Sequence, residues 1–330
     1  MNLPHVSMIV IFHNEYWSVL LRTLWSIYNR TPHELIHEII LVNDASDREI
    51  LYDPLAKYVE EHFHGMVKIL NLKERKGLIV TRMEGVKIAT GEVLVFFDSH
   101  IEVNSNWLPP LIEPIALNPR ISTQPIIDKF NPQTFEYEIY SDNGQRGVFD
   151  WNFVFIYFNL KPEDKIDPSL PHETPLMLGG IFAINRQYFW DLGGYDDQLL
   201  IWNGENYELS FKLWLCGGQI LEVPCSRVAH TFRKHFKFRK HDGVDFEYRN
   251  FKRVAEVWMD DWKEFLYDRD PKRYAAIDAG DLTKQKAIRK QLNCLPFDYF
   301  MKYVAPEISA HYPVPYAGDF AYGHLKCESE

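Results

Sequence analysis

The chain has 330 residues, of which 46% are hydrophobic and 15% aromatic, enough for a substantial core in one large domain or two. Its formal net charge of −10 argues against nucleic acid or an anionic membrane as a general partner, so an anionic ligand would need a local basic cluster. No apolar run reaches the roughly 18–20 residues of a membrane span, and the N-terminus does not resemble a signal peptide. Four cysteines are too few for a disulfide scaffold and leave free thiols, one bridge or two bridges open.

The first hundred residues alternate apolar, β-rich runs with stretches of helical spacing. They predict strands at residues 6–12, 38–42, 67–71 and 92–97, separated by helices at 16–28, 50–62 and 78–89. This alternation implies βαβ units and a parallel sheet with right-handed crossovers. No Gly-x-Gly-x-x-Gly turn follows the first strand and no Walker loop is present, so dinucleotide-binding and P-loop interpretations lose support.

The fourth predicted strand ends in an acid and an imidazole, Asp98 and His100. Ligands bind at the carboxyl ends of strands in open α/β sheets, and side chains at i and i+2 of an extended chain point the same way. A carboxylate with a neutral imidazole suits a divalent metal and leaves positions open for substrate oxygens. The alternative is a turn-forming Asp beside an ordinary surface His. Taken alone, these residues favour that alternative over a metal site. Asp44, after the second strand, could bind a ribose or base or could be a solvated turn residue.

The second half is less regular. Gly179 and Gly180 adjoin an apolar run at 181–184 and suggest a bulge or a ligand against the main chain. A helix is predicted at 208–216, with Glu205 and Asn206 as candidate caps before it, and a strand at 220–223 follows. Further on, residues 254–267 are amphipathic and 281–292 are predicted to be helical, and residues after Ile308 resemble an extended tail.

The segment that begins at His230 is unusually basic for an acidic protein. It contains Arg233, Lys234 and His235, with Phe232 among them. The segment predicts a local anion site or a lid, and a solvated basic loop is the alternative.

Several separate motifs occur together and in a familiar order. They are Phe12-His-Asn-Glu15, Asp98-Ser-His100, Gly179-Gly180, Trp202-Asn-Gly-Glu-Asn206, Cys216-Gly-Gly and Pro224-Cys-Ser-Arg-Val-Ala-His230. From about Val6 to Ile308 the chain resembles the catalytic domain of the polypeptide N-acetylgalactosaminyltransferases. The resemblance implies an α/β fold of the GT-A, Rossmann-like type, with a mostly parallel central sheet flanked by helices. It also implies a retaining, Mn²⁺-dependent enzyme that transfers GalNAc from UDP-GalNAc to Ser/Thr hydroxyls of polypeptides, starting mucin-type O-glycans.

The resemblance also implies residue roles. Asp98, His100 and His230 would hold Mn²⁺. Contacts to the sugar nucleotide are expected from Asp44, Arg75, Arg82, Ser99, Gly179, Gly180, Arg233, Lys234 and His235. Glu205 and Asn206 would contact the hydroxyls and the N-acetyl group of GalNAc. Trp202 would lie beneath the active site or on a moving loop. Phe149, Trp151 and Phe232 would line the groove for the acceptor peptide. No covalent enzyme nucleophile is inferred.

On the same grounds, residues 1–308 are expected to form a single catalytic domain. Residues 1–100 would be its nucleotide-binding half and 101–308 its sugar and acceptor half, with a closing loop at 230–250. Residues 309–330 would be a tail, with the lectin domain and the membrane anchor of the family absent, and the natural location would be the Golgi lumen. Cys216 is expected to bridge Cys294, whereas the family's partner for Cys225 lies upstream of the first strand and is missing. Cys327 would mark the start of the lectin domain.

Two departures from the family pattern concern the nucleotide turn and the mobile loop. Asn43-Asp44 stands where relatives usually have Asp-Asp, and Asn203 stands where they have Gly. Three alternatives stay open: a related GT-A transferase using another UDP-sugar, a catalytically silent UDP- or peptide-binding paralogue, and a metal-dependent hydrolase.

Overall fold

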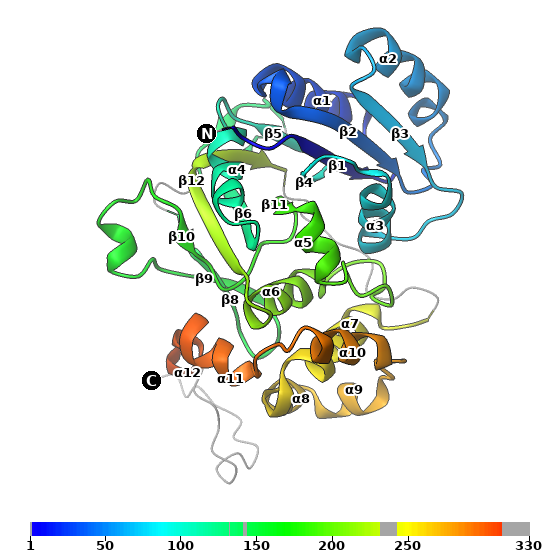
Figure 1. Ribbon diagram of the computed structural model, residues 1–330. Helices are drawn as coiled ribbons and strands as arrows, with labels where there is room; N and C mark the ends of the chain where they lie inside the picture. Colours follow the sequence, from blue (N-terminus) through cyan, green and yellow to red (C-terminus); the bar gives the residue numbers. More distant parts are fainter. Residues whose placement is uncertain (1, 132, 141–143, 232–242, 312–330) are drawn as a thin grey trace, which may run out of the picture.

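The computed structural model describes residues 2–131, 133–140, 144–231 and 243–311. Ten strands form the main sheet: β1 (Val6–Phe12), β2 (Ile36–Asn43), β3 (Val67–Asn71), β4 (Val93–Asp98), β5 (Ile101–Val103), β6 (Ile121–Phe130), β7 (Tyr137–Glu138), β10 (His172–Glu173), β11 (Phe182–Asn185) and β12 (Gln219–His230). Their order is β10-β12-β6-β11-β4-β1-β2-β3, with β5 paired to β12 and β7 to β6 (Figure 1). A hairpin of β8 (Arg146–Phe149) and β9 (Phe155–Phe158) stands apart.

The sheet is mixed but mostly parallel. The pairs β1–β2, β1–β4, β2–β3 and β6–β12 are parallel, whereas β11 runs antiparallel to both β4 and β6. Because β11 lies between β4 and β6 and opposes both, β4, β6 and β12 all run in one direction. Their carboxyl ends therefore lie at one edge, the edge where ligands bind in such sheets.

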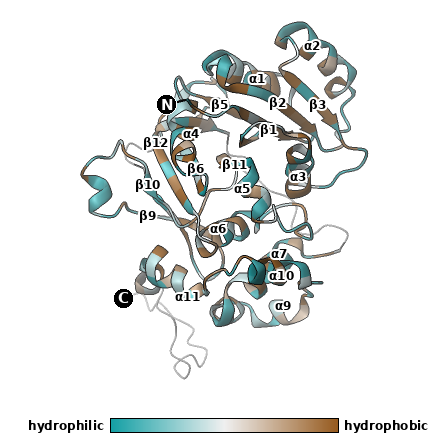
Figure 2. Ribbon diagram, viewed as in Figure 1, coloured by the Kyte–Doolittle hydropathy of each residue, from teal (hydrophilic) through white to brown (hydrophobic). Residues whose placement is uncertain are grey.

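Helices cover both faces of the sheet. They are α1 (Trp17–Arg30), α2 (Asp53–Phe63), α3 (Leu78–Ile88), α4 (Leu108–Leu117), α5 (Arg186–Asp191), α6 (Glu205–Leu215), α7 (Phe246–Trp258), α8 (Lys263–Tyr267), α9 (Pro271–Ala276), α10 (Thr283–Gln291), α11 (Phe297–Tyr299) and α12 (Glu307–His311). Alternate residues of β1 join two different cores, as period-2 alternation requires: Met8 and Val10 pack with α1, α2 and α4, whereas Ile9 and Ile11 pack with α3, α5 and α6. Figure 2 shows the strands as the hydrophobic centre between these layers.

The predicted strands at 6–12 and 67–71 match β1 and β3, and the other first-half elements differ mainly at their ends. The predicted helix at 50–62 is instead a 3₁₀ turn, Glu49–Leu51, followed by α2 with Pro54 in its first turn. The second half departs further, because β12 runs on to His230, well beyond the predicted 220–223, and the amphipathic 254–267 region divides between α7, a 3₁₀ turn and α8. The expectation of a tail from residue 309 is wrong for residues 309–311, because they belong to α12. Cys327 lies outside the described residues.

The disulfide implied by the family resemblance is confirmed, because Cys216 is bonded to Cys294. The bridge ties the end of α6 to the segment after α10, two elements separated by 78 residues. Cys225 is a free, exposed thiol. Within the described ranges, the helices all fall short of the length and apolar character that crossing a bilayer requires.

A buried carboxylate on β2 makes the stability of the sheet dependent on pH. Burial alone would raise the pKa of Glu38, but hydrogen bonds from Lys68 and from Ser7 outweigh it and lower the pKa to about 2. Because this folded-state value lies below the ordinary 4.5, the stabilisation is present above about pH 4.5 and is lost as the pH falls toward 2.

We expect Glu38→Gln to lower the free energy of unfolding at pH 7 by about 2 kcal/mol, less than the full shift implies because Lys68 is half-exposed. The deficit should shrink steadily between pH 5 and pH 3 in urea denaturation series. A deficit that is constant over this range would contradict the assignment.

Candidate active site at the carboxyl edge of the sheet

Three polar turns meet where β1, β2 and β4 end. The turn after β1 is tied to the turn after β2, because His13 Nδ1 lies 2.7 Å from the carbonyl oxygen of Asp44 and the amide of Asn14 donates to Ser46 Oγ over 2.8 Å. Asn14 has a φ of 53°, in the left-handed region that Asn tolerates better than most residues. These contacts hold the edge in a defined shape before any ligand binds.

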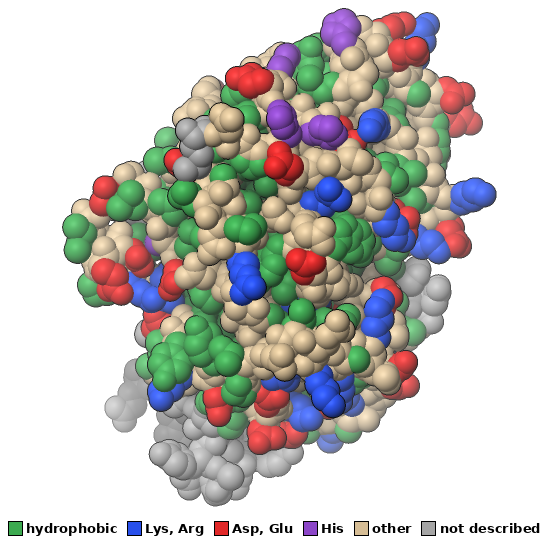
Figure 3. All heavy atoms as spheres, in the orientation of Figure 1, with side chains coloured by type: hydrophobic (Ala, Val, Ile, Leu, Met, Phe, Trp, Pro, Cys, Tyr) green, Lys and Arg blue, Asp and Glu red, His purple; other side chains and the backbone are tan. Residues whose placement is uncertain are grey.

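Asp98, His100 and His230 come together at this edge. One ligand atom from each lies within 4.8 Å of the others, and His230 Nε2 is 3.1 Å from Asp98 Oδ2. Although His230 is 132 residues away in sequence, β5 follows His100 directly and pairs with β12, setting His230 opposite Ile101. On the face of the molecule that Figure 3 shows, acidic and basic side chains are mixed over the surface, and several histidines lie toward its top.

The electrostatics of the cluster favour an ionised carboxylate. Burial alone would raise the pKa of Asp98, yet the hydrogen bond and charge of His230, with the charge of Arg82, hold that pKa well below its usual range. An ionised carboxylate and two imidazole nitrogens form a donor set suited to a divalent transition metal such as Mn²⁺ or Zn²⁺. The residues therefore fit the metal that the sequence predicts.

A fourth residue fixes the orientation of His100. Glu15 Oε2 lies 2.9 Å from His100 Nδ1 and accepts a second hydrogen bond from Ser99 Oγ at 2.9 Å. Because Nδ1 is engaged by this carboxylate, Nε2 is the nitrogen left to face the metal. A carboxylate that orients a metal-binding histidine is a common supporting contact in metal sites.

We expect Glu15→Ala to raise the Mn²⁺ concentration for half-maximal binding by about 10- to 100-fold, because His100 loses the partner that orients it. Mn²⁺ binding measured by calorimetry or electron paramagnetic resonance would check this without any turnover assay. Glu60→Ala, an exposed position on α2, is the matched control and should bind Mn²⁺ as the unmodified chain does. Equal affinity in both variants would remove Glu15 from the site.

Arg82 is the buried cation of the site. Only 1% exposed, it lies 3.6 Å from Asp98 Oδ1 and 3.7 Å from Glu205 Oε1, and its Nη2 donates to the carbonyl oxygen of Gly180 over 3.5 Å. Burial raises the pKa of Glu205, and the charge of Arg82 opposes that rise. Arg82 Nε and Nη1 and Glu205 Oε2 are buried and make no hydrogen bond to described residues.

The paired glycines permit a close approach at the same place. They precede β11 rather than interrupting it, and Gly179 has a φ of 90° that favours glycine. A Cβ on Gly180 would lie 3.0 Å from Asp98 Oδ2, and one on Gly179 would lie 2.9 Å from the Cβ of Asn206. Glu205 and Asn206 form the first turn of α6 after Gly204, so they are helical residues rather than caps.

Other predicted residues are placed as follows. The carboxylate of Asp44 accepts hydrogen bonds from the amides of Lys76, at 2.6 Å, and Gly77, at 2.9 Å, which fixes the start of α3. Gly77 in turn pairs with Ile201, beside Trp202. Arg75 lies on the exposed loop before α3. The hydroxyl of Ser99 donates to Glu15 Oε2, and the carbonyl oxygen of Ser99 accepts from Thr23 Oγ1, each at 2.9 Å.

The expectation that Phe149 and Trp151 line an open groove is wrong for this structure. Phe149 is 0% exposed and Trp151 1%, because both rings pack in the core, Phe149 against Phe211 and Trp151 against Trp262. Phe232, Arg233, Lys234 and His235, with most of the closing loop predicted at 230–250, lie outside the described residues.

Sequence reasoning missed one further residue of the site. Asn250 of α7 is fully buried, and its side chain accepts from the amide of Leu200 and donates to the carbonyl oxygens of Leu200, Trp202 and Asn203. These hydrogen bonds hold the backbone of Trp202 and its neighbours in place. A lone Asn within an amphipathic helix carries no signal of this role.

The comparisons with known proteins agree with the fold. The family model described as "Glycosyl transferase family 2" matches residues 7–193, and "N-terminal domain of galactosyltransferase" matches 164–240. N-acetylgalactosaminyltransferase 4 of Drosophila melanogaster is 52% identical over 98% of the chain and 50% of its own length. Polypeptide N-acetylgalactosaminyltransferase 10 of Homo sapiens is 47% identical over 98% of the chain and 53% of its own length.

Among solved structures, that of GalNAc-T7 with UDP, GalNAc and Mn²⁺ superposes with a TM-score of 0.90 at 39% identity, covering 95% of this chain and 59% of that one. The fold and the Asp-His-His cluster thus define a glycosyltransferase domain of the GT-A type. More narrowly, the chain belongs to glycosyl transferase family 2, and over nearly its whole length it is similar to polypeptide N-acetylgalactosaminyltransferases. It spans about half the length of the curated relatives it matches.

Proposed function

We propose that the chain transfers GalNAc from UDP-GalNAc, with retention of configuration, to Ser or Thr hydroxyls of polypeptides, and that Asp98, His100 and His230 bind Mn²⁺. The observation that carries the proposal is the meeting of these three side chains at the carboxyl edge of a GT-A sheet. The relatives support it, since two carry the transferase name and the solved structure contains UDP, GalNAc and Mn²⁺.

The leaving group explains why the site holds cationic groups. A nucleoside diphosphate departs with growing negative charge, which a metal bound at the triad would stabilise as a Lewis acid. Glu15 keeps His100 in its binding orientation, and Arg82 adds a buried positive charge 3.6 Å from Asp98. The basic residues Arg233, Lys234 and His235 follow His230 and would contact the same diphosphate.

Arg82 and the groups around it would bind the sugar. The donors of Arg82 and the acceptor of Glu205, which are buried and make no hydrogen bond to described residues, suit sugar hydroxyls. Asn206 offers an amide for the N-acetyl group, and Gly179 and Gly180 bring main chain close to Asn206 and Asp98. Asp44 and Arg75, at the end of β2 and before α3, would meet the uridine side.

We place the acceptor polypeptide on the side of residues 101–308, within one catalytic domain over 1–308, and the natural protein in the Golgi lumen. Phe232 remains a candidate for the acceptor groove, whereas Phe149 and Trp151 would support that groove from the core beneath it. No enzyme carboxylate is assigned as a nucleophile, because Glu205 is buried beside Arg82 and suits hydrogen bonding to the sugar.

A donor panel tests the proposal. UDP-GalNAc, UDP-GlcNAc, UDP-Gal and UDP-Glc are incubated with Mn²⁺ and a library of Thr-containing peptides, and the glycosylated products are identified by mass. We expect transfer from UDP-GalNAc to exceed transfer from the others. Transfer of another sugar in preference would indicate a related transferase. UDP release that is independent of peptide would indicate a hydrolase, and UDP binding without turnover a silent paralogue.

A further inference from the structure

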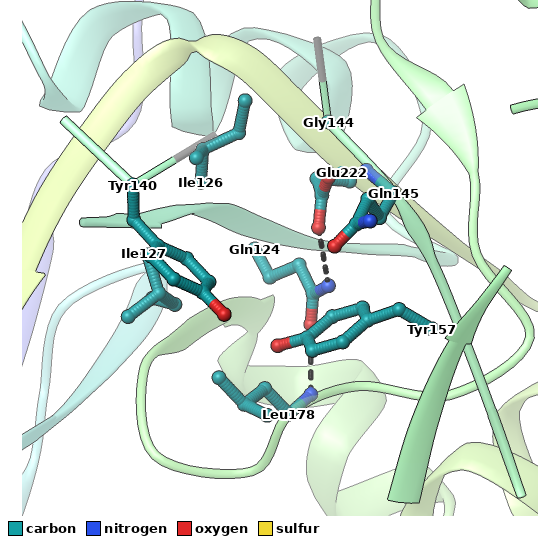
Figure 4. A pocket seen from close by; sticks show the side chains of 9 residues that line it. All are labelled: Gln124, Ile126, Ile127, Tyr140, Gly144, Gln145, Tyr157, Leu178 and Glu222. Atoms are coloured by element: carbon teal, nitrogen blue, oxygen red, sulfur yellow. Dashed lines mark hydrogen bonds between the residues drawn. The ribbon is translucent and has the colours of Figure 1, made fainter. Parts of the chain in front are cut away.

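A pocket adjoins the segment that leads into the paired glycines. It is lined by Gln124, Ile126, Ile127, Tyr140, Gly144, Gln145, Tyr157, Leu178 and Glu222 (Figure 4). Leu178 directly precedes Gly179, and the amide of Leu178 donates to Gln124 Oε1 at the pocket wall. The pocket wall therefore adjoins, in the sequence, the two glycines of the site that would hold the sugar.

The distance along the sheet from this pocket to the metal triad is short. β6 and β12 run parallel, with Gln124 opposite Glu222, Ile127 opposite Val228 and Lys129 opposite His230. At about 3.3 Å per residue, the pocket lies about 7–17 Å from the level of His230. An extended peptide covers the same distance in about two to five residues.

The chemistry of the pocket centres on a buried carboxylate. Glu222 is 6% exposed; its Oε1 accepts from the amide of Gln145 and its Oε2 from Gln124 Nε2, each at 3.0 Å. Its ion-pair neighbour is His172 on β10, whose Nε2 lies 3.5 Å from Glu222 Oε1. These neighbours supply hydrogen bonds but no permanent positive charge.

This lack of a Lys or Arg partner sets Glu222 apart from most buried carboxylates in the described ranges. Those that form an ion pair with Lys or Arg are Glu38, Glu102, Asp128, Asp196, Glu205 and Glu208. Glu15 bonds to His100, and Asp44 to two backbone amides, so both belong to the site already described. Since a buried charge without a counter-charge is costly, Glu222 is suited to a cation from outside the chain.

Two tyrosine rings complete the binding surface. Tyr140, 56% exposed, and Tyr157, 42% exposed, enter the pocket from different segments (Figure 4). Burial and the charge of Glu222 both raise the pKa of Tyr157, which places that ring in the field of the carboxylate. Tyr140 already carries an ammonium group on its ring, since Lys129 Nζ is 3.5 Å from the ring centroid. Aromatic faces and a carboxylate together favour a cationic side chain over a neutral one.

We propose that this pocket binds a lysine or arginine side chain of the acceptor polypeptide, two to five residues from the hydroxyl that receives the sugar. Ile126, Ile127 and Leu178 would pack along the aliphatic stem while the charged end reaches Glu222. The inference rests on the proposed transferase function and adds a preference in the acceptor to it.

The test is a set of peptides with one Thr and a single Lys moved from five residues before it to five residues after it. Each is compared with the peptide carrying norleucine, which has a stem of similar size and no charge. With UDP-GalNAc and Mn²⁺, we expect kcat/KM to be about 10-fold higher for Lys at the best position, mostly through KM. Glu222→Gln should bring the Lys and norleucine peptides to within about twofold while leaving the KM for UDP-GalNAc unchanged.

The matched control is Glu173→Gln, which removes one negative charge from the neighbouring strand position outside the pocket and should keep the Lys preference. Tyr140→Ala, at an exposed ring, should also weaken the preference, and it covers the case in which Glu222→Gln does not fold. A Lys preference that is absent, or equal in all variants, would overturn the pocket assignment while transfer itself persists. A higher kcat/KM for peptides that already carry a sugar next to the Thr, with no gain from Lys, would also overturn it. Failure of every peptide to accept GalNAc would instead defeat the proposed function.

Discussion

Replacing His230 by alanine is expected to lower kcat/KM for transfer by about 1,000-fold, which corresponds to about 4 kcal/mol of transition-state stabilisation. The reason is geometric, because His230 supplies one of three ligand atoms that lie within 4.8 Å of one another. Its Nε2 is also 3.1 Å from Asp98 Oδ2, so its loss leaves the metal-binding carboxylate less well held. Initial rates at saturating UDP-GalNAc over a range of Mn²⁺ concentrations would measure the effect.

The control for this change is His37→Ala, an exposed histidine on β2 away from the carboxyl edge, which should keep full activity. Circular dichroism should show both variants folded. If His230→Ala kept both its turnover and its dependence on Mn²⁺, the metal assignment would fail.

Replacing Arg82 by methionine is expected to be the most destabilising single change at the site. Methionine fills much of the same space but leaves Asp98 and Glu205 without their shared counter-charge. Removing one partner of a buried ion pair typically costs about 3–5 kcal/mol, and we expect a loss of that size in the free energy of unfolding at pH 7. Denaturant unfolding monitored by tryptophan fluorescence would measure it.

The double variant Arg82→Met with Glu205→Gln separates charge from packing. If uncompensated charge is the cause, the second substitution should restore part of the lost stability, because it removes one of the two stranded carboxylates. A double variant no more stable than the single one would show that the guanidinium acts through packing alone. Activity should stay low in both, since each lacks the donors offered to the sugar.

Much of the first half could be predicted because its signals are local. A buried parallel strand is a short apolar run, and β1 and β4 each show this pattern. The i, i+2 spacing of Asp98 and His100 predicted that both side chains address one point. His230 could not be reached by this reasoning, because its position depends on the pairing of β5 with β12, a contact across more than a hundred residues. Only the family resemblance connected it to the other two.

The residues that sequence reasoning misjudged are ones whose burial or partners come from distant elements. Phe149 and Trp151 have the aromatic character of a binding groove, but rings from α6 and from the region of α8 cover them. Glu15 was part of a motif with no role assigned, and the hydrogen bond to His100 reveals one. Glu222 falls in an unremarkable strand sequence, and its lack of a Lys or Arg partner is visible only in three dimensions.

The stereochemistry and metal dependence of the product test the account most directly. A Thr peptide incubated with the chain, UDP-GalNAc and Mn²⁺ would be purified and its anomeric configuration determined by NMR, in parallel with a reaction containing EDTA. We predict an α-linked GalNAc on the Thr hydroxyl, formed with Mn²⁺, abolished by EDTA and restored when Mn²⁺ is added back. A β-linked product, or an equal yield in EDTA, would contradict a retaining transferase built on Asp98, His100 and His230.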